Sequence, residues 1–238
     1  MKDNGTPLES YLDPHFITRS NWLRAAVLGA NDGILSTTSI AIGVAAASDS
    51  KEPIILATLA GLVAGALSMA AGEYVSVSSQ TDVEKADIER EQKELEEMPE
   101  MELEMLTQIY QERGLKRETA QLVAKELTEK DALAAHVRDE LGINDISQAK
   151  PIQAALASGA SFTIGALLPL AVALFLPLKN LEYYLYGFGI FFLISLGAMA
   201  AKAGGSSILK ATARITFWGT IAMGITALVG YLFDVTVG

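Results

Sequence analysis

Five long apolar stretches constrain this chain of 238 residues more than any other feature. They cover residues 25–47, 53–79, 152–178, 183–201 and 215–233. Only Asp32 in the first stretch and Glu73 in the second carry a charge. About 20 apolar residues in an α-helix cross the ~30 Å hydrocarbon core of a bilayer. Because buried helices of soluble proteins usually keep a polar stripe, the sequence predicts an all-α integral membrane protein with five transmembrane helices.

The charged residues gather in one block. Residues 80–150 hold 19 of the 28 acids and 10 of the 18 bases, a net charge of −9. The other 167 residues hold 9 acids and 8 bases, a net charge of −1. A single soluble domain would spread its charge over its whole surface. We therefore expect an N-terminal segment (1–20), two transmembrane helices (21–79), an acidic helical domain (80–150) and three more transmembrane helices (151–238).

The acidic block is predicted to be a small helical bundle. Residues 80–98 lack glycine and proline and continue the second apolar stretch as one helix. Pro99 ends that helix, because proline is poor inside a helix but acceptable in the first turn of the next one. Further helices are expected over residues 100–112, 117–127 and 128–141. Thr128 and Asp131 resemble a capping box at the start of the last helix.

The polar junctions between the apolar stretches, and the basic residues near them, predict how the chain is oriented in the membrane. We expect the junctions at residues 49–53, 177–180 and 202–214. One side carries the acidic block and most of the basic residues, which are Arg19, Arg24, Lys202, Lys210 and Arg214. The other side carries only Lys51 and Lys179. Since lysine and arginine stay on the cytoplasmic side, the N-terminus and residues 80–150 are predicted to be cytoplasmic and the C-terminus to be outside.

Composition and missing motifs exclude several functions. The chain has no cysteine, which excludes disulfides, thiolate metal sites and cysteine nucleophiles. A pI near 4.7 without a basic stripe argues against a nucleic-acid partner. The motifs of zinc proteases, serine hydrolases and P-loop ATPases are absent. We predict neither an enzyme nor a bound prosthetic group. The polar N-terminus and the short chain favour a prokaryotic plasma membrane.

Two acids at membrane depth are the first candidates for chemistry. A carboxylate there costs on the order of 3 kcal/mol, so Asp32 and Glu73 need a partner or a wet cavity. Met69 lies four residues before Glu73 and shares its helix face. Two carboxylates with a thioether favour a divalent transition metal over Ca²⁺ or Mg²⁺. In the alternative interpretation, Asp32 caps a broken helix and Glu73 snorkels to the interface.

Further candidates lie in the acidic block at helical spacing. They are Asp87, Glu91 and Glu94 on one helix with Met98 at its end, Met101, Glu102 and Met105 on the next, and His136 and Glu140 on the last. Carboxylates repeated on one helix face repel each other, and a bound cation would turn that repulsion into coordination. The alternative is a solvated acidic face with methionines that fill gaps in the core.

Small residues on the second stretch indicate close helix packing. Gly61 and Gly65 form a GxxxG pattern, which lets two helices approach closely in lipid. The pattern fits a dimer and packing within one chain equally well.

Three segments resemble the vacuolar iron transporter family. They are residues 30–37 (ANDGILST), residues 61–77 (GLVAGALSMAAGEYVSV) and residues 151–169. The resemblance covers about residues 20–235 and is that of a prokaryotic-type member. It implies a homodimer in the lipid bilayer, with a cytoplasmic metal-binding domain between the second and third transmembrane helices. It also implies proton-coupled export of Fe²⁺ from the cytosol, with Mn²⁺, Zn²⁺ or Co²⁺ as further ions.

The resemblance also assigns roles to residues. Asp32 and Met69 would line the path at the dimer interface, with Glu73 near its cytoplasmic mouth. The ligands of the cytoplasmic domain would be Glu91, Glu94, Glu102 and Glu140. Met105 stands where another glutamate is expected and His136 where plant relatives have methionine, which predicts fewer ions or softer ones. The rival hypotheses are a Mn²⁺ exporter of the same mechanism and a membrane-anchored iron store or sensor.

Overall fold

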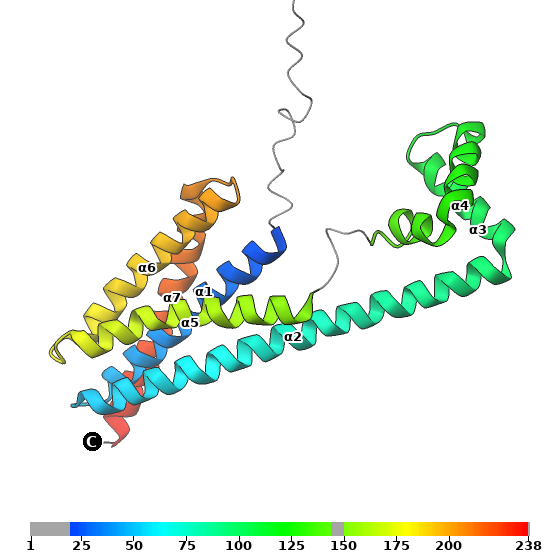
Figure 1. The fold of residues 1–238 in the computed structure, drawn as a ribbon. Helices are drawn as coiled ribbons and strands as arrows, with labels where there is room; N and C mark the ends of the chain where they lie inside the picture. Colours follow the sequence, from blue (N-terminus) through cyan, green and yellow to red (C-terminus); the bar gives the residue numbers. More distant parts are fainter. Residues whose placement is uncertain (1–19, 144–149, 238) are drawn as a thin grey trace, which may run out of the picture. The chain divides into compact units, whose positions relative to one another are not determined.

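Helices form all of the regular structure in residues 20–143 and 150–237, the part of the chain that the computed structural model describes. In chain order they are α1 (Ser20–Ala45), α2 (Lys51–Glu97), α3 (Pro99–Glu112), α4 (Arg117–Asp139), α5 (Pro151–Phe175), α6 (Leu181–Ala203) and α7 (Ile208–Val237) (Figure 1). The predicted N-terminal segment lies outside the described residues apart from Ser20.

Five of these helices are long and apolar enough to cross a membrane. They are α1, α2, α5, α6 and α7. The prediction of an all-α membrane protein with five transmembrane helices is confirmed. The junction expected at residues 202–214 is wrong in extent, because α7 already begins at Ile208. Lys210 and Arg214 lie in its first turns and are exposed, where long basic side chains can extend toward water.

The chain divides into two units. The first contains Met1–Tyr74 and Ile152–Gly238, and the second contains Val75–Pro151. We call them the membrane unit and the acidic unit. Helix α2 contributes its apolar part to the membrane unit and its charged part to the acidic unit.

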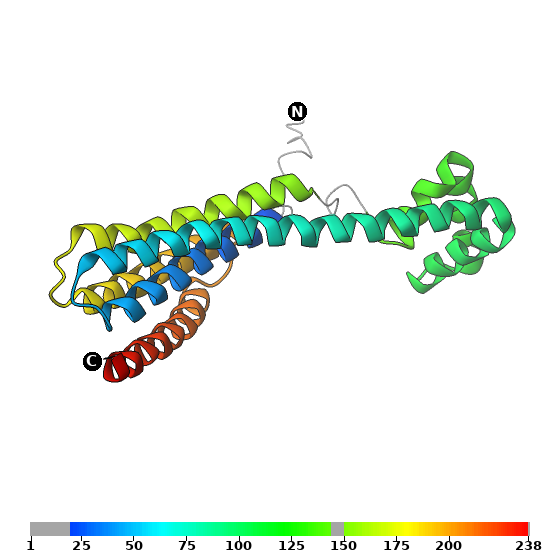
Figure 2. The ribbon, with the colours of Figure 1, turned by 90° about the horizontal axis from the view of Figure 1, so that it is seen from below.

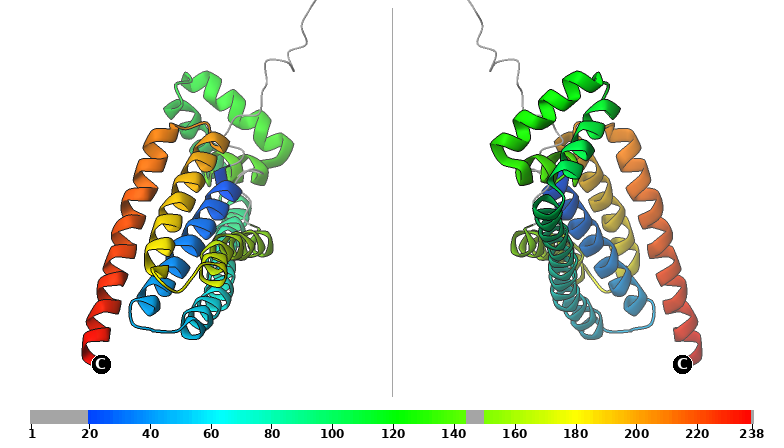
Figure 3. Two further views of the ribbon diagram at one scale, coloured as in Figure 1. Left: turned by 90° about the vertical axis from the view of Figure 1, so that its left-hand side faces the viewer. Right: turned by 90° about the vertical axis from the view of Figure 1, so that its right-hand side faces the viewer.

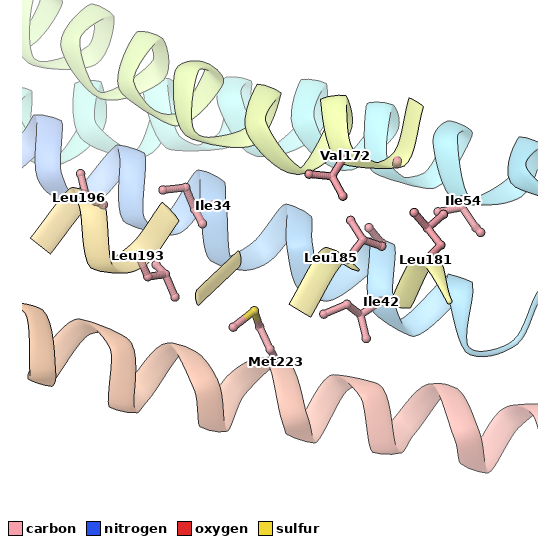
Figure 4. Close-up of a cluster of buried hydrophobic side chains, with 11 residues drawn as sticks. Ile34, Ile42, Ile54, Val172, Leu181, Leu185, Leu193, Leu196 and Met223 are labelled. Carbon is pink, nitrogen blue, oxygen red and sulfur yellow. The ribbon is translucent and has the colours of Figure 1, made fainter. Parts of the chain in front are cut away.

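In the membrane unit α1 contacts each of the other helices. It packs against α6 and α7, which also contact each other (Figures 1 and 3). On its other side α5 runs beside α1 and beside the apolar part of α2 (Figure 2). All five helices contribute to one buried apolar cluster (Figure 4). The labelled members of this cluster are Ile34, Ile42, Ile54, Val172, Leu181, Leu185, Leu193, Leu196 and Met223.

Helices α1 and α5 touch each other backbone to backbone near Asp32. A Cβ atom added at Gly33 would overlap the carbonyl oxygen of Phe162. A Cβ atom at Gly29 would lie 2.6 Å from the carbonyl oxygen of Ser158, which is also too close. Such close approach is possible only for small residues, and in lipid it supplies the van der Waals contact that holds helices together. These glycines therefore fix the segment of α1 that carries Asp32.

The two glycines of the GxxxG pattern also pack within the chain. A Cβ atom at Gly65 would overlap the ring of Phe162 on α5. A Cβ atom at Gly61 would lie 2.8 Å from Cδ1 of Ile40 on α1. Of the two interpretations of this pattern, the structure shows the one within a single chain.

The acidic unit is built on the packing of α3 against α4 (Figure 1). Its buried apolar core consists of Leu106, Tyr110, Ala120, Ala124 and Ala135. Helix α3 begins at Pro99, as the sequence predicts. Both helices expected over residues 117–127 and 128–141 are present within α4, and the extended residue Asp131 (φ −168°, ψ 96°) separates them.

The predicted capping box at Thr128 is wrong. The Oδ1 atom of Asp131 accepts a hydrogen bond from the backbone N–H of Ala134 at 2.9 Å. Asp131 is thus the N-cap of the second part of α4, because a cap needs an extended backbone and a side-chain oxygen that reaches the third residue onward. The Thr128 hydroxyl is buried and has no hydrogen-bond partner among the described residues.

Candidate metal sites

Four of the predicted residues converge inside the acidic unit. Glu91 comes from α2, Glu102 from α3, and His136 and Glu140 from the end of α4. One ligand atom of each lies within 4.8 Å of the others. Ligand atoms around one ion with bonds of about 2.1 Å lie roughly 3 to 4 Å apart. A small inward movement would therefore complete a shell of one nitrogen and three oxygens. We call these residues the four-ligand cluster.

The imidazole of His136 is the centre of the four-ligand cluster. It is fully buried, and its Nδ1 atom lies 2.9 Å from Oε2 of Glu140 in hydrogen-bond geometry. The same nitrogen lies 2.9 Å from Oε1 of Glu91 and 3.9 Å from Oε2 of Glu102. A ring N–H points in one direction only, so Oε1 of Glu91 is a buried oxygen without a hydrogen bond in the described part of the chain. A bound cation would satisfy that oxygen.

Electrostatics in the four-ligand cluster also favours a cation. Glu91 and Glu102 are buried, and Glu140 is half-buried. Burial raises the pKa of the Glu102 carboxyl, His136 lowers it, and the nearby charges of Glu140 and Glu94 raise it further. Carboxylates packed together away from water are costly unless an opposite charge neutralises them. A divalent ion would supply that charge and would use the same oxygens as ligands.

Sequence reasoning missed Asp139, which joins the ends of α3 and α4. The Tyr110 hydroxyl donates to Oδ2 of Asp139 at 2.7 Å, and Nη1 of Arg113 donates to Oδ1 at 2.5 Å. Burial alone would raise the pKa of Asp139, but hydrogen bonds from Arg138, Tyr110 and Arg113 lower it to about 2. One signal could have revealed this role: an acid in the last turn of a helix, where the helix dipole disfavours it.

Two predicted ligands of the acidic unit lie outside the four-ligand cluster. Glu94 is half-buried, with Oε2 3.7 Å from Nε of Arg90. Met105 is 38% exposed. Two other candidates, Met98 just before α3 and Met101 on it, are exposed as well. Glu94 still acts on the cluster through its charge, as its effect on the pKa of Glu102 indicates.

In the membrane unit the three predicted residues lie on two helices. Asp32 is on α1, Met69 and Glu73 are on α2, and all three are half-buried. Among the described residues, neither carboxylate has a hydrogen bond or an ion pair. The interpretation of Asp32 as the cap of a broken helix is wrong, because α1 is helical through this position.

Helix α5 connects the surroundings of Asp32 and Met69. Met69 packs against an apolar cluster that contains Phe162 of α5. The carbonyl oxygen of the same Phe162 faces Gly33, the residue after Asp32. The buried Phe162 is thus shared by the segments that carry the carboxylate and the thioether. The Asp32 carboxylate and the Met69 thioether thus place one negative charge and one soft ligand atom within the spanning helices.

Two features are typical of a membrane transport protein for cations. The first is a set of five spanning helices with unpaired acids among them. The second is a separate buried group of carboxylates around one imidazole. Comparison with known proteins agrees. The chain belongs to the VIT family, whose model matches residues 23–231. Members of this family are transporters, which confirms both the resemblance seen in the sequence and the prediction that the chain is not an enzyme.

Several relatives share most of their length with this chain. A vacuolar iron transporter of Acanthamoeba castellanii is 48% identical over 221 residues, which cover 90% of this chain and 80% of the relative. Vacuolar iron transporter homolog 5 of Oryza sativa subsp. japonica is 35% identical over 209 residues, or 87% of this chain and 78% of the relative. Vacuolar iron transporter homolog 2 of Arabidopsis thaliana is 34% identical over 219 residues, which cover 89% of this chain and 86% of the relative.

Proposed function

We propose that this protein is an Fe²⁺/H⁺ antiporter that exports iron from the cytosol. Membership of the VIT family and the names of its relatives support transport of iron or a similar metal ion. The observation that carries the proposal is the four-ligand cluster, with its buried, unsatisfied oxygen on Glu91. Carboxylates with one imidazole suit a divalent transition metal.

In the proposed mechanism the acidic unit gathers Fe²⁺ and the membrane unit moves it. The ion passes to Glu73 and then to Asp32 and Met69. Protons arriving from the far side neutralise the carboxylates, release the ion and reset the site. Support comes from the half-buried acids without partners, since a carboxylate at membrane depth belongs to ion and proton pathways by default. The Met69 thioether favours a transition metal over Mg²⁺ or Ca²⁺.

The proposal includes an orientation and a homodimer. The positions of the lysines and arginines support a cytoplasmic side that holds the N-terminus and residues 80–150. In a plasma membrane, the location expected from the sequence, export from the cytosol is export from the cell. The apolar part of α2 is covered little within the chain, and Leu56, Val63 and Leu67 are exposed. This face is available to lipid or to a second copy.

Two other functions have support from particular residues. Carboxylates and imidazole also suit Mn²⁺, so a Mn²⁺ exporter with the same mechanism is the second candidate. A membrane-anchored iron store or sensor would use the four-ligand cluster alone. Asp32 argues against a store, because a store has no need of a carboxylate inside a spanning helix.

A flux measurement separates these three functions. The purified chain is reconstituted into liposomes, and entry of Fe²⁺, Mn²⁺ and Zn²⁺ is followed with and without an imposed pH gradient. We expect Fe²⁺ to enter fastest and to depend on the gradient. Faster entry of Mn²⁺ would favour the second candidate. Metal binding without any entry above that of protein-free liposomes would leave only the store.

A further inference from the structure

The structure points to a set of residues that position the metal ligands without binding the metal. We propose that Tyr110, Arg113 and Asp139 form a latch that holds the end of α4 against α3, and so presents Glu140 and His136 to the ion. The inference rests on the proposed function, because it assumes that the four-ligand cluster binds a metal.

The position of Glu140 creates the need for such a latch. Glu140 is the C-cap residue of α4, and helix ends fray. Its backbone N–H bonds to the carbonyl oxygen of His136 at 2.8 Å, and the N–H of Ile143 bonds to that of Val137 at 2.9 Å. Gly142, with φ +69°, makes this closing turn possible. These bonds close the end of α4 on itself, but they do not attach it to another helix.

The latch supplies that attachment through both the side chain and the backbone of Asp139. Its carboxylate accepts hydrogen bonds from Tyr110 and Arg113 on the neighbouring element. In addition, Nη2 of Arg113 donates at 2.9 Å to the carbonyl oxygen of Asp139, one of the last carbonyls of a helix, which have no partner within it. The Asp139 side chain is only 8% exposed, so water competes little for these bonds.

Groups from both α3 and α4 stabilise the acid at this position. A negative charge in the last turn of a helix is disfavoured by the helix dipole. Here the carboxylate lies between the guanidinium groups of Arg113 and Arg138. Two of the groups that bond to it, Tyr110 and Arg113, come from α3 and its end, and this contact lies one residue before the ligand Glu140.

The latch also sets a distance inside the four-ligand cluster. Glu102 and Tyr110 lie on the same helix, α3, with the buried Leu106 between them. His136 and Asp139 lie within one turn of each other on α4. Tyr110 and Asp139 form the latch, whereas Glu102 and His136 lie in the cluster. Holding Tyr110 to Asp139 therefore also holds Glu102 beside His136. The separation between Oε2 of Glu102 and Nδ1 of His136 is 3.9 Å.

The test uses Co²⁺ as a spectroscopic probe of the full-length protein in detergent. The signal of the four-ligand cluster is the part of the Co²⁺ absorption that Glu102→Gln removes. We expect Asp139→Asn to weaken Co²⁺ binding at this site by roughly tenfold to a hundredfold, the range for groups that orient metal ligands. At saturating Co²⁺ its absorption band should also shift. A change that only loosened the fold would lower the affinity but leave the saturated band unaltered.

Matched variants keep the inference open to contradiction. Tyr110→Phe removes a single hydroxyl and should give a smaller shift of the same kind, even if Asp139→Asn folds poorly. Glu104→Gln breaks the other ion pair between α3 and α4, in which Nη1 of Arg117 lies 2.9 Å from Oε1 of Glu104, and it should leave the band and the affinity unchanged. An unshifted band in both latch variants, or an equal effect of Glu104→Gln, would overturn the latch. If Glu102→Gln removed no signal, the metal-binding function itself would fail.

Discussion

The two units of this protein treat their acids in opposite ways. In the acidic unit three glutamates from three helices are gathered around one buried imidazole, and the proposed latch holds the end of α4, which carries two of the four ligands. In the membrane unit Asp32 and Glu73 lie half-buried on separate helices and have no partner among the described residues. A transport path must bind its ion weakly enough to release it, whereas a collecting site profits from a complete shell. The difference suggests a division of labour between capture and passage.

The two units also differ in what holds their helices together. Glycines allow α1 and α5 to touch backbone to backbone in the membrane unit, where lipid gives no hydrophobic drive for association. In the acidic unit α3 and α4 combine a small apolar core with polar bonds at their ends. Substitutions should therefore damage the two units by different routes.

The largest effect is expected from Asp32→Ala. Removing the carboxylate of the proposed path should reduce Fe²⁺ flux in proteoliposomes to the level of protein-free liposomes. Fe²⁺ binding to the four-ligand cluster should stay within about twofold of wild type, because that cluster belongs to the other unit. Unchanged flux would exclude Asp32 from the path. Loss of binding together with flux would contradict the division of labour.

The reverse pattern is expected when the four-ligand cluster is changed. Glu91→Gln combined with Glu102→Gln should weaken Fe²⁺ binding, measured by calorimetry on the full chain, by about a hundredfold or more. Flux should fall at low Fe²⁺ and recover at high Fe²⁺. Adding Glu94→Gln should have little further effect, since Glu94 is half-buried beside Arg90. Unaltered affinity in the triple variant would make these acids a solvated face.

A third change probes the packing of the membrane unit. In Gly33→Ala the new methyl group would overlap the carbonyl oxygen of Phe162, and overpacking of this kind costs about 1 to 3 kcal/mol. We expect a clear fall in the unfolding temperature in detergent, together with reduced flux. Gly72→Ala is the matched control, because nothing lies within 4 Å of a Cβ atom added there. Equal melting of the two variants would refute the close contact of α1 and α5.

The smallest effect is expected at the break in α4. Asp131→Ala removes the N-cap bond to Ala134 and should destabilise the acidic unit by about 1 kcal/mol, measurable by urea unfolding followed through its helical signal. Thr128→Val should be neutral, because the Thr128 hydroxyl has no hydrogen-bond partner in the described structure. A larger loss from Thr128→Val than from Asp131→Ala would restore the capping box expected from the sequence.

Much of the fold could be predicted because hydropathy acts locally. The five apolar stretches revealed all five spanning helices, and Pro99 marked the boundary between α2 and α3. The start of α7 was missed because Lys210 and Arg214 resemble loop residues in a sequence, although a helix end can carry them. The cap was misplaced because Thr128 and Asp131 both offer a suitable oxygen, and only the backbone conformation at Asp131 decides between them.

All four residues of the cluster were among the candidates predicted from the sequence. The sequence did not show which of the candidates would come together. Helical spacing pointed to Glu91, Glu94, Met105 and His136 alike, since it shows only which residues share a face. Tertiary packing decides that Glu91 and His136 are buried while Met105 is exposed. Asp139 escaped notice because, next to Arg138, it resembles an ordinary surface ion pair. Its bonds to Tyr110 and Arg113 arise only when α3 and α4 meet.

Proton coupling of iron transport is the central claim of this account, and one recording tests it directly. Proteoliposomes with an acidic lumen are loaded with one dye for Fe²⁺ and another for pH, and Fe²⁺ is added outside. We predict that Fe²⁺ entry and a rise in luminal pH occur together, and that both vanish in Asp32→Ala. Fe²⁺ entry at the normal rate with no change in luminal pH, and at the same rate once a protonophore has collapsed the pH gradient, would contradict it.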